Sequence, residues 1–178
     1  MEQESSPLKY YMGCDVGKSG GIVLMDENGN IIEVGTMPTI GKEYDTTQME
    51  YMMNIDGLEH IAIEDVHAFH NGGSTSNFQF GLGKGLLMGL AAGMSIPFTL
   101  VQPKLWQKEC WEGVTKVMKP LKAGQKKATV DTKATSLVAV KRLFPKQDLR
   151  KSERAKIPHD GIVDAILICE YIRRKFNK

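Results

Sequence analysis

The chain has 178 residues, of which 42% are hydrophobic and 25% charged, and its formal net charge is +2. These values are typical of one globular domain that is long enough to enclose its own hydrophobic core. No apolar run approaches the roughly 20 residues that a membrane span needs, and the acidic, polar start is unlike a secretory signal peptide.

The first third of the chain is predicted to consist mainly of strands. An apolar run indicates a strand over 10–16, and two more are expected over 22–25 and 31–36, joined by an Asn-Gly hairpin turn. A helix is expected over 45–56, starting near Thr46 or Thr47. A short buried strand over 60–66 follows, because its apolar residues are mostly β-branched.

The middle of the chain alternates helices and strands. A polar, glycine-rich loop over 67–76 precedes a helix over 78–94, whose apolar residues recur at helical spacing. Glycine inside a helix costs roughly 1 kcal/mol relative to alanine, so we expect these glycines to allow close approach of another backbone, a partner helix or DNA. A strand over 96–101 and a short helix over 103–111, which begins with a proline at a tolerated position, come next.

The last third contains two basic loops and two helices. A lysine-rich loop over 112–128 leads to a helix over 130–144, and a second basic loop over 145–157 leads to an amphipathic helix over 159–176. Three strands in a meander, followed by strands alternating with helices, predict an α/β fold in which helices cover a mixed sheet.

Cysteine usage and the absence of repeats complete the outline. Cys14, Cys110 and Cys169 are an odd, widely spaced set, which argues against a disulfide framework or a zinc site and favours a reducing, cytoplasmic location. We find no internal repeat and no domain boundary. We therefore expect a single domain over residues 1–178, with 1–8 as a flexible N-terminal tail.

The charges are distributed unevenly along the chain. Residues 1–100 hold four Lys/Arg against thirteen Asp/Glu, whereas residues 101–156 hold fifteen Lys/Arg against five Asp/Glu. A nearly neutral total can therefore include a basic face suited to a polyanion, while acidic groups serve another purpose. The alternative is a solvated surface with an uneven charge layout.

Four acidic residues stand where a buried apolar element ends, and acids are unusual at such positions. Asp15 ends the first strand, Glu64 ends the fourth, and Asp160 and Asp164 open the last helix. Residues four apart on a helix share one face, about 5–6 Å from each other. Three of the acids also have a purely structural explanation. Asp15 could cap a turn, Glu64 could be a paired charge at the sheet edge, and Asp160 could cap the helix. Asp164 is harder to explain, because a lone acid among apolar neighbours is costly.

Taken together, the four carboxylates predict a metal site. Clustered carboxylates repel one another, so such a cluster is sensible when hard cations neutralise it. Oxygen ligands from Asp and Glu suit magnesium or manganese rather than zinc. Two such ions roughly 4 Å apart form the arrangement that hydrolyses phosphodiesters, in which one activates the attacking water and the other stabilises the leaving oxygen.

Three sequence strings in this order resemble the RuvC family of junction resolvases. They are Gly-Cys-Asp-Val-Gly-Lys-Ser-Gly-Gly at 13–21, Ile-Glu-Asp-Val-His-Ala-Phe at 63–69 and His-Asp-Gly-Ile-Val-Asp-Ala at 159–165. The segments 76–81, 97–106, 133–136 and 143–145 also match. The resemblance covers roughly residues 10–172 and is closest to the resolvase-like proteins of phages and prophages. It implies an RNase H-like fold with a mixed five-stranded sheet flanked by helices, in a bacterial or phage-infected cell.

The resemblance also implies roles for the four acids. It makes Asp15 the central ligand of two Mg²⁺ ions (with Mn²⁺ as a substitute), Glu64 a second ligand, and Asp164 the helical ligand that pairs with Asp15. Asp160 is retained as a further catalytic ligand, although many family members have the two helical acids three apart, and Gly161 holds that place here. In the alternative assignment, Asp160 is not a direct ligand and the neighbouring His159 contacts the scissile phosphate.

For substrate and assembly, the resemblance implies a homodimer that nicks two opposed strands of a four-way (Holliday) junction. An aromatic residue that stacks on junction bases corresponds to His67 or Phe69, and core packing is the alternative for Phe69. The helix over 78–94 would lie at the dimer interface. The family uses a lysine in catalysis, for which Lys104, Lys108, Lys122 and Lys126 are candidates. The expected DNA-binding lysines are these four together with Lys116 and Lys127.

Three alternative functions follow from the same residues. A debranching nuclease for replication forks would use the same site on a broader set of substrates. A sugar-kinase-like ATPase would use Asp15 to Gly21 as a phosphate loop, but 178 residues leave no room for its duplicated domain. A non-catalytic junction-binding module is disfavoured because Asp15, Glu64 and Asp164 are intact.

Overall fold

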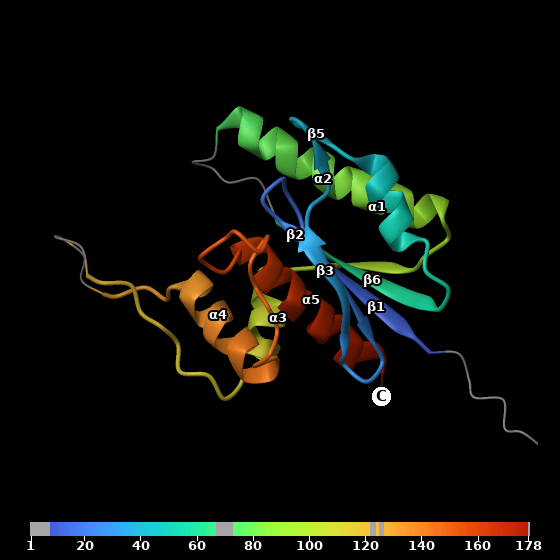
Figure 1. Cartoon of the computed structure of the whole chain (residues 1–178). Coiled ribbons are helices and arrows are strands. Elements are labelled where there is room, and N and C mark those ends of the chain that lie inside the picture. The colour runs from blue at the N-terminus through green and yellow to red at the C-terminus, as the bar shows by residue number, and fades with distance from the viewer. Residues whose placement is uncertain (1–7, 67–72, 122–123, 125–126, 178) are drawn as a thin grey trace, which may run out of the picture.

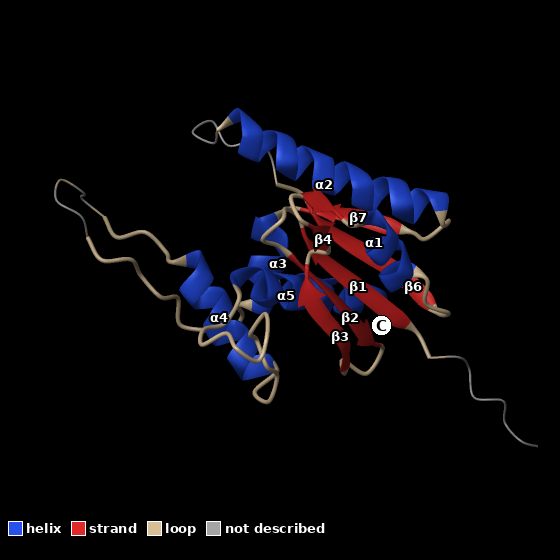
Figure 2. Ribbon diagram, turned by 45° about the horizontal axis from the view of Figure 1, so that its top comes forward, coloured by secondary structure: helices blue, strands red, loops and turns tan. Residues whose placement is uncertain are grey.

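The structure, a computed structural model, describes residues 8–66, 73–121, 124 and 127–177. Within them, a five-stranded sheet has the strand order β3-β2-β1-β6-β7, and a two-stranded ribbon, β4-β5, lies beside it (Figures 1 and 2). The strands are β1 Tyr10–Asp15, β2 Gly21–Asp26, β3 Ile31–Thr36, β4 Thr39–Ile40, β5 Glu43–Tyr44, β6 Leu58–Glu64 and β7 Phe98–Val101.

The first three strands form an antiparallel meander. β1 pairs with β2 from Tyr10↔Asp26 to Asp15↔Gly21, and β2 pairs with β3. The turn between β2 and β3 places Gly29 at φ 86°, a left-handed conformation that favours glycine. The Asp26 side chain accepts hydrogen bonds from the backbone and side chain of Asn30, which closes the turn. The predicted hairpin is therefore confirmed.

The other half of the sheet is parallel. β6 pairs with β1, and β7 pairs with β6, in both cases in the same direction. Parallel pairs need a crossover connection, and helices α1 and α2 provide it. Because β1 and β6 run in parallel, their carboxyl ends meet at one edge of the sheet, and the last residues of both are acidic.

Helices cover both faces of the sheet. α1 and α2 lie on one face, and α3, α4 and α5 lie on the other (Figure 1). Their bounds are α1 Thr46–Met53, α2 Ser74–Gly93, α3 Pro103–Cys110, α4 Thr132–Leu143 and α5 Asp160–Phe176. Along β1, Tyr11 packs toward α5 while Met12 and Cys14 pack toward α1 and α2, because alternate residues of a strand face opposite sides.

Helix α5 lies directly against β1. A side chain at Gly13 would place its Cβ 2.6 Å from the Ala165 carbonyl oxygen, so the helix can approach this closely only because residue 13 is glycine. Eleven residues of α5 are buried, from Gly161 to Ile172. The α/β fold expected from the sequence, a mixed five-stranded sheet flanked by helices, is confirmed.

Several predicted boundaries were wrong by up to four residues. α2 begins at Ser74 rather than 78, because its first turn is polar and exposed and carries no apolar periodicity. α1 ends at Met53 rather than 56, ahead of a turn with Gly57 at φ 83°. β7 begins at Phe98 rather than 96, after a turn with Ser95 at φ 58°. The ribbon β4-β5 was not predicted, because strands of two residues have no detectable alternation.

The basic loop between α3 and α4 extends away from the body of the protein (Figures 1 and 2). Its two legs are joined by a bridge between Met118 and Val130 and by backbone hydrogen bonds from Lys119 to Thr129 and from Asp131 to Val117. We call the described residues of this loop, 112–121, 124 and 127–131, the basic arm. Val114 and Val130 pack against the core, whereas the described lysines of the arm, Lys116, Lys119 and Lys127, are exposed to solvent.

The cysteines lie in the core. Cys14, Cys110 and Cys169 are all free and buried. In the part of the chain that the structure describes, no helix combines the length and the apolar character needed to cross a membrane.

Candidate active site

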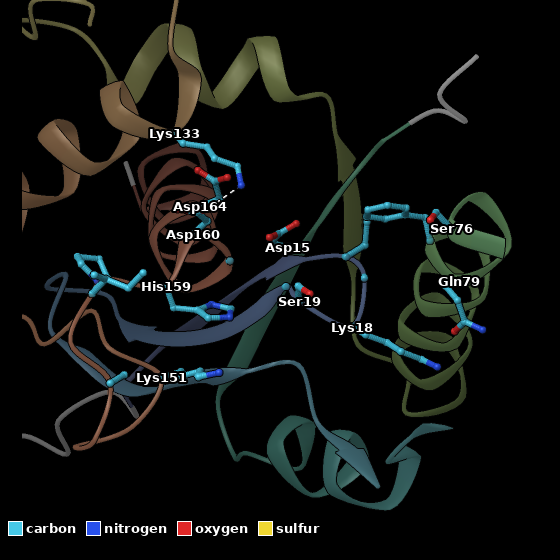
Figure 3. A pocket seen from close by; sticks show the side chains of 18 of the residues that line it. Asp15, Lys18, Ser19, Ser76, Gln79, Lys133, Lys151, His159, Asp160 and Asp164 are labelled. Atoms are coloured by element: carbon cyan, nitrogen blue, oxygen red, sulfur yellow. Dashed lines mark hydrogen bonds and ion pairs between the residues drawn. The ribbon is translucent and has the colours of Figure 1, made fainter. Parts of the chain in front are cut away.

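Three carboxylates converge at the edge where β1 and β6 end. Asp15 and Glu64 are the last residues of these neighbouring parallel strands, and the register pairs Cys14 with Ile63 one residue earlier. Asp164 lies on the second turn of α5, the helix that packs on β1. Figure 3 shows Asp15 between α5, which carries Asp160 and Asp164, and the first turns of α2.

The three carboxylates perturb one another strongly. Burial, and then the charges of Glu64 and Asp164, raise the pKa of Asp15 well above its ordinary value. Burial and the charge of Glu64 raise the pKa of Asp164 to about 7. Burial also raises the pKa of Glu64, which shares a hydrogen bond with Asp15. Without a cation, the cluster therefore retains protons near neutral pH, and a divalent ion would replace them.

Asp160 lies at the rim of this cluster. Its carboxylate forms an ion pair with Lys133 at 2.5 Å, and the two side chains are 55% and 68% exposed. The hydrogen bond to Asp160, together with the charges of Asp164 and Asp15, raises the pKa of Lys133. The structure thus brings Asp15, Glu64 and Asp164 together, whereas Asp160 faces a lysine at the entrance.

Two neutral side chains lie behind the acids. The Trp106 indole donates a hydrogen bond from Nε1 to Glu64 Oε1 at 3.1 Å, and both residues are buried. Ser136, on α4, lies close enough to Asp164 to lower the pKa of that carboxyl. Its hydroxyl oxygen is buried and has no other hydrogen-bond partner among the described residues. The Ser136 hydroxyl is therefore available to donate to Asp164.

A cavity of about 640 Å³ opens in front of the acids. Its floor is the loop between β1 and β2, and one wall is the start of α2, including Gln79 and Phe80 (Figure 3). The other wall is the end of the second basic loop, up to His159. Three lysines line the cavity, namely Lys18, Lys133 and Lys151. The cavity thus has three lysines on its walls and three aspartates, Asp15, Asp160 and Asp164, and this mixed lining could receive a phosphate together with a cation.

Glycines allow the two elements under this cavity to touch. A Cβ at Gly161 would lie 2.6 Å from Gly20 Cα, and one at Gly21 would lie 2.6 Å from the Gly161 carbonyl oxygen. The start of α5 therefore packs on the loop after β1, which is why glycine occupies position 161. His159 caps this helix, and burial, followed by the charge of Lys151, lowers the pKa of its imidazole. His159 is therefore neutral at pH 7 and suited to donate or accept a hydrogen bond.

The donor set fits magnesium, although no closed cage is present. Among the described residues, no three acidic, histidine or cysteine side chains already surround a common point at ligand distances. Mg²⁺ prefers oxygen ligands and is usually held by one or two carboxylates plus water and substrate phosphate rather than by a complete protein cage. The mutually repelling carboxylates of Asp15, Glu64 and Asp164, of which Glu64 is buried and the other two are partly buried, match that preference.

The predicted DNA-binding residues fall into two groups. His67, Phe69, Lys122 and Lys126 lie outside the described residues. Lys104 and Lys108 are exposed one turn apart on α3, and Lys116 and Lys127 are exposed on the basic arm. These four lysines do not line the cavity. The proposed role of all these residues in binding DNA stays a prediction.

Several residues that the structure brings to the site had no role assigned from the sequence. They are Lys133, Lys151, Trp106 and Ser136. Lys133 carried a detectable signal. It is the second residue of α4, whose N-cap is Asp131, and the helix dipole disfavours a cation in the first turn of a helix. A lysine at such a position indicates an acidic partner elsewhere in the fold. Trp106 and Lys151 carried no local signal.

Comparison with solved structures shows a RuvC fold. No protein-family model and no curated protein sequence matches the chain. RuvC from Thermus thermophilus, solved in complex with a Holliday junction substrate, superposes with a TM-score of 0.58 at 11% identity, over 95% of this chain and 97% of that one. A second Thermus thermophilus RuvC structure gives a TM-score of 0.57 at 13% identity, over 93% and 96% of the two chains. The RNase H-like fold expected from the sequence is thus confirmed.

Proposed function

We propose that this protein is a magnesium-dependent endonuclease that resolves four-way DNA junctions by nicking two opposed strands. The observation that carries the proposal is the convergence of Asp15, Glu64 and Asp164 at one sheet edge, beside a cavity that three lysines line. The likeness in fold to RuvC over almost the full length of both chains supports the choice of substrate, because that protein is described with a Holliday junction.

The carboxylates would hold the metal, and other residues would hold the DNA. Asp15, whose pKa is raised by the charges of both Glu64 and Asp164, would be a ligand together with these two acids. When bound, Mg²⁺ supplies activation of water and neutralisation of the charge that develops on phosphate. Lys133, held at the rim by Asp160, can move to a phosphate oxygen as DNA enters the cavity. Neutral His159 can hydrogen-bond the same phosphate or its neighbour.

The exposed lysines would hold the arms of the junction. Lys116 and Lys127 are on the basic arm, and Lys104 and Lys108 are on α3, so they could contact phosphates outside the cavity. Because the cavity and these lysines are separate, DNA affinity and metal loading depend on different residues. His67 or Phe69 would stack on an exposed base, worth about 1–3 kcal/mol.

A homodimer would place two such sites on opposed strands. A four-way junction is nearly two-fold symmetric, and a two-fold dimer matches it. One face of α2 supports this assembly, because Gly81, Gly85, Gly89 and Gly93 recur every four residues and a Cβ on any of them would meet nothing within 4 Å. Phe78 on the same helix is 65% exposed. A second copy of α2 could therefore approach closely.

The decisive experiment compares Asp15→Asn with wild type on three substrates: a four-way junction, a three-way fork and a linear duplex, each with Mg²⁺. We expect wild type to make paired, symmetric nicks in the junction, and Asp15→Asn to cut at least 1000-fold more slowly (about 4 kcal/mol) while binding the junction about equally well. Asp56→Asn is the matched control, because Asp56 is exposed at the opposite end of β6.

Other results would select a different function. Equal cutting of forks and junctions would indicate a debranching nuclease. Tight junction binding without cutting, in either Mg²⁺ or Mn²⁺, would indicate a binding module and contradict the proposed catalysis.

A further inference from the structure

Glu64 is held by a residue from a distant part of the sequence. The Trp106 Nε1–H donates to Glu64 Oε1 at 3.1 Å across a separation of 42 residues. Trp106 is 1% exposed and Glu64 is 7% exposed. This contact is therefore shielded from water, where a hydrogen bond to a charged group is strong and its loss is costly.

The sheet determines where Trp106 lies. Glu64 pairs with Val101 at the last step of the parallel register between β6 and β7. Two residues later, Pro103 starts α3, and its fixed φ favours the first helical position. Trp106 follows one turn into the helix, with its indole directed back at the end of β6. The donor and the acceptor are thus fixed by adjacent strands and a short, rigid connection.

An indole suits this task for a chemical reason. It has one donor and no acceptor, and it is neutral. A lysine or arginine here would neutralise the carboxylate and compete with a cation, whereas the indole orients one oxygen and leaves the negative charge in place. A side chain that orients a ligating carboxylate commonly contributes a factor of 10–100 to metal affinity.

We infer that Trp106 is a positioning residue that holds Glu64 in the orientation required to bind the metal. This inference rests on the proposed function, in which Glu64 is a metal ligand. Trp106 acts through Glu64 and does not touch the metal or the DNA.

The chain contains its own matched control. Its only other tryptophan, Trp111, packs edge-on against Trp106 with ring centroids 6.4 Å apart. Trp111 is 9% exposed, and its buried Nε1 has no hydrogen-bond partner among the described residues. Trp111→Phe therefore removes an indole from the same core cluster without removing a hydrogen bond. Trp106→Phe removes an indole together with its hydrogen bond to Glu64.

The test is Mn²⁺ binding to the DNA-free protein, measured from the free-ion signal in electron paramagnetic resonance. We expect Trp106→Phe to bind Mn²⁺ at least 10-fold more weakly than wild type, and Trp111→Phe to stay within 2-fold. In a Glu64→Gln background, Trp106→Phe should cause no further loss. Equal weakening by the two phenylalanine variants, no weakening by Trp106→Phe, or the same loss in the Glu64→Gln background would each overturn the inference.

A second measurement uses the wild-type protein, in case Trp106→Phe does not fold. With ¹⁵N-labelled tryptophan, the two indole N–H signals are assigned through Trp111→Phe and followed during a Mg²⁺ titration. The Trp106 signal should shift with saturation while the Trp111 signal moves little; a static Trp106 signal would overturn the inference. If the wild-type protein binds no metal in either experiment, the proposed function fails as well. If Glu64→Gln loses metal binding but Trp106→Phe keeps it, only the role of Trp106 is contradicted.

Discussion

At the scale of single residues, the site consists of carboxylates that repel one another and that the fold holds close together. Asp164 is partly buried near Glu64, and its pKa is raised to about 7. An acid whose pKa is higher in the folded than in the unfolded state stabilises the fold only while it is protonated. The contribution of Asp164 to the stability of the metal-free protein therefore falls as the pH rises from about 4 to about 7.

Replacement of this carboxyl should remove the penalty. We expect Asp164→Asn to stabilise the metal-free protein at pH 8, by on the order of 2 kcal/mol, because it removes a partly buried negative charge that lies near Glu64. At pH 4 the change should be close to zero, since the wild-type carboxyl is protonated there. The measurement is urea unfolding in EDTA at both pH values. An equal change at pH 4 and pH 8 would show that packing rather than charge is responsible.

At the scale of elements, the approach of α5 to β1 decides whether the acids meet. Gly13 lies under α5, next to Ala165 and Cys169, and its missing side chain determines the distance between helix and strand. Asp164 adjoins Ala165, so a displacement of α5 at this point would also move Asp164 away from Asp15. The strand-helix contact and the metal site are therefore coupled.

Gly13→Ala tests this coupling. The added methyl group would overlap the backbone of α5, so we expect a loss of about 3 kcal/mol or more in unfolding free energy, at the upper end of overpacking effects. Gly35→Ala is the control, because Gly35 is also in the sheet but a Cβ there meets nothing within 4 Å. Thermal or urea unfolding compares the two. Similar stabilities for the two variants would mean that α5 can move away without cost.

At the scale of the whole molecule, the acidic and basic parts of the sequence lie in different parts of the structure. The acidic first part of the chain supplies Asp15 and Glu64, whereas half of the described lysine and arginine residues lie on the arm, on α3 and in the loop before α5. The resulting surface can attract a polyanion to a site that remains acidic at its centre. Binding of DNA by such a surface depends on salt, because phosphate contacts release counterions.

The basic arm should account for a measurable part of that salt dependence. For the double variant Lys116→Ala/Lys127→Ala, we expect the slope of log affinity for a four-way junction against log salt to fall by about 1–2, at roughly 0.9 per lost phosphate contact. Lys9→Ala/Lys175→Ala removes the same charge from the opposite end of the molecule and should leave the slope unchanged. Equal slopes for the two double variants would place the DNA elsewhere.

Much of this fold was predictable because its signals are local. The Asn-Gly turn, the strand over 31–36 and the amphipathic last helix each depend on residues within a few positions of one another, and all three were confirmed. Asp15, Glu64 and Asp164 were identifiable because acids at the ends of buried elements are unusual. The short ribbon β4-β5 and the polar first turn of α2 lacked such a signal, and both were missed.

The sequence by itself determined the types of element, the α/β class and the four acidic candidates, because propensity, periodicity and turn chemistry operate over short distances along the chain. Only the tertiary structure decided which acids converge: the parallel pairing of β1 with β6 and the packing of α5 on Gly13 unite three of them and leave Asp160 with Lys133 at the rim. It also brought Trp106 to Glu64 across 42 residues. Contacts of this kind depend on sheet register and helix packing, which no short stretch of sequence contains.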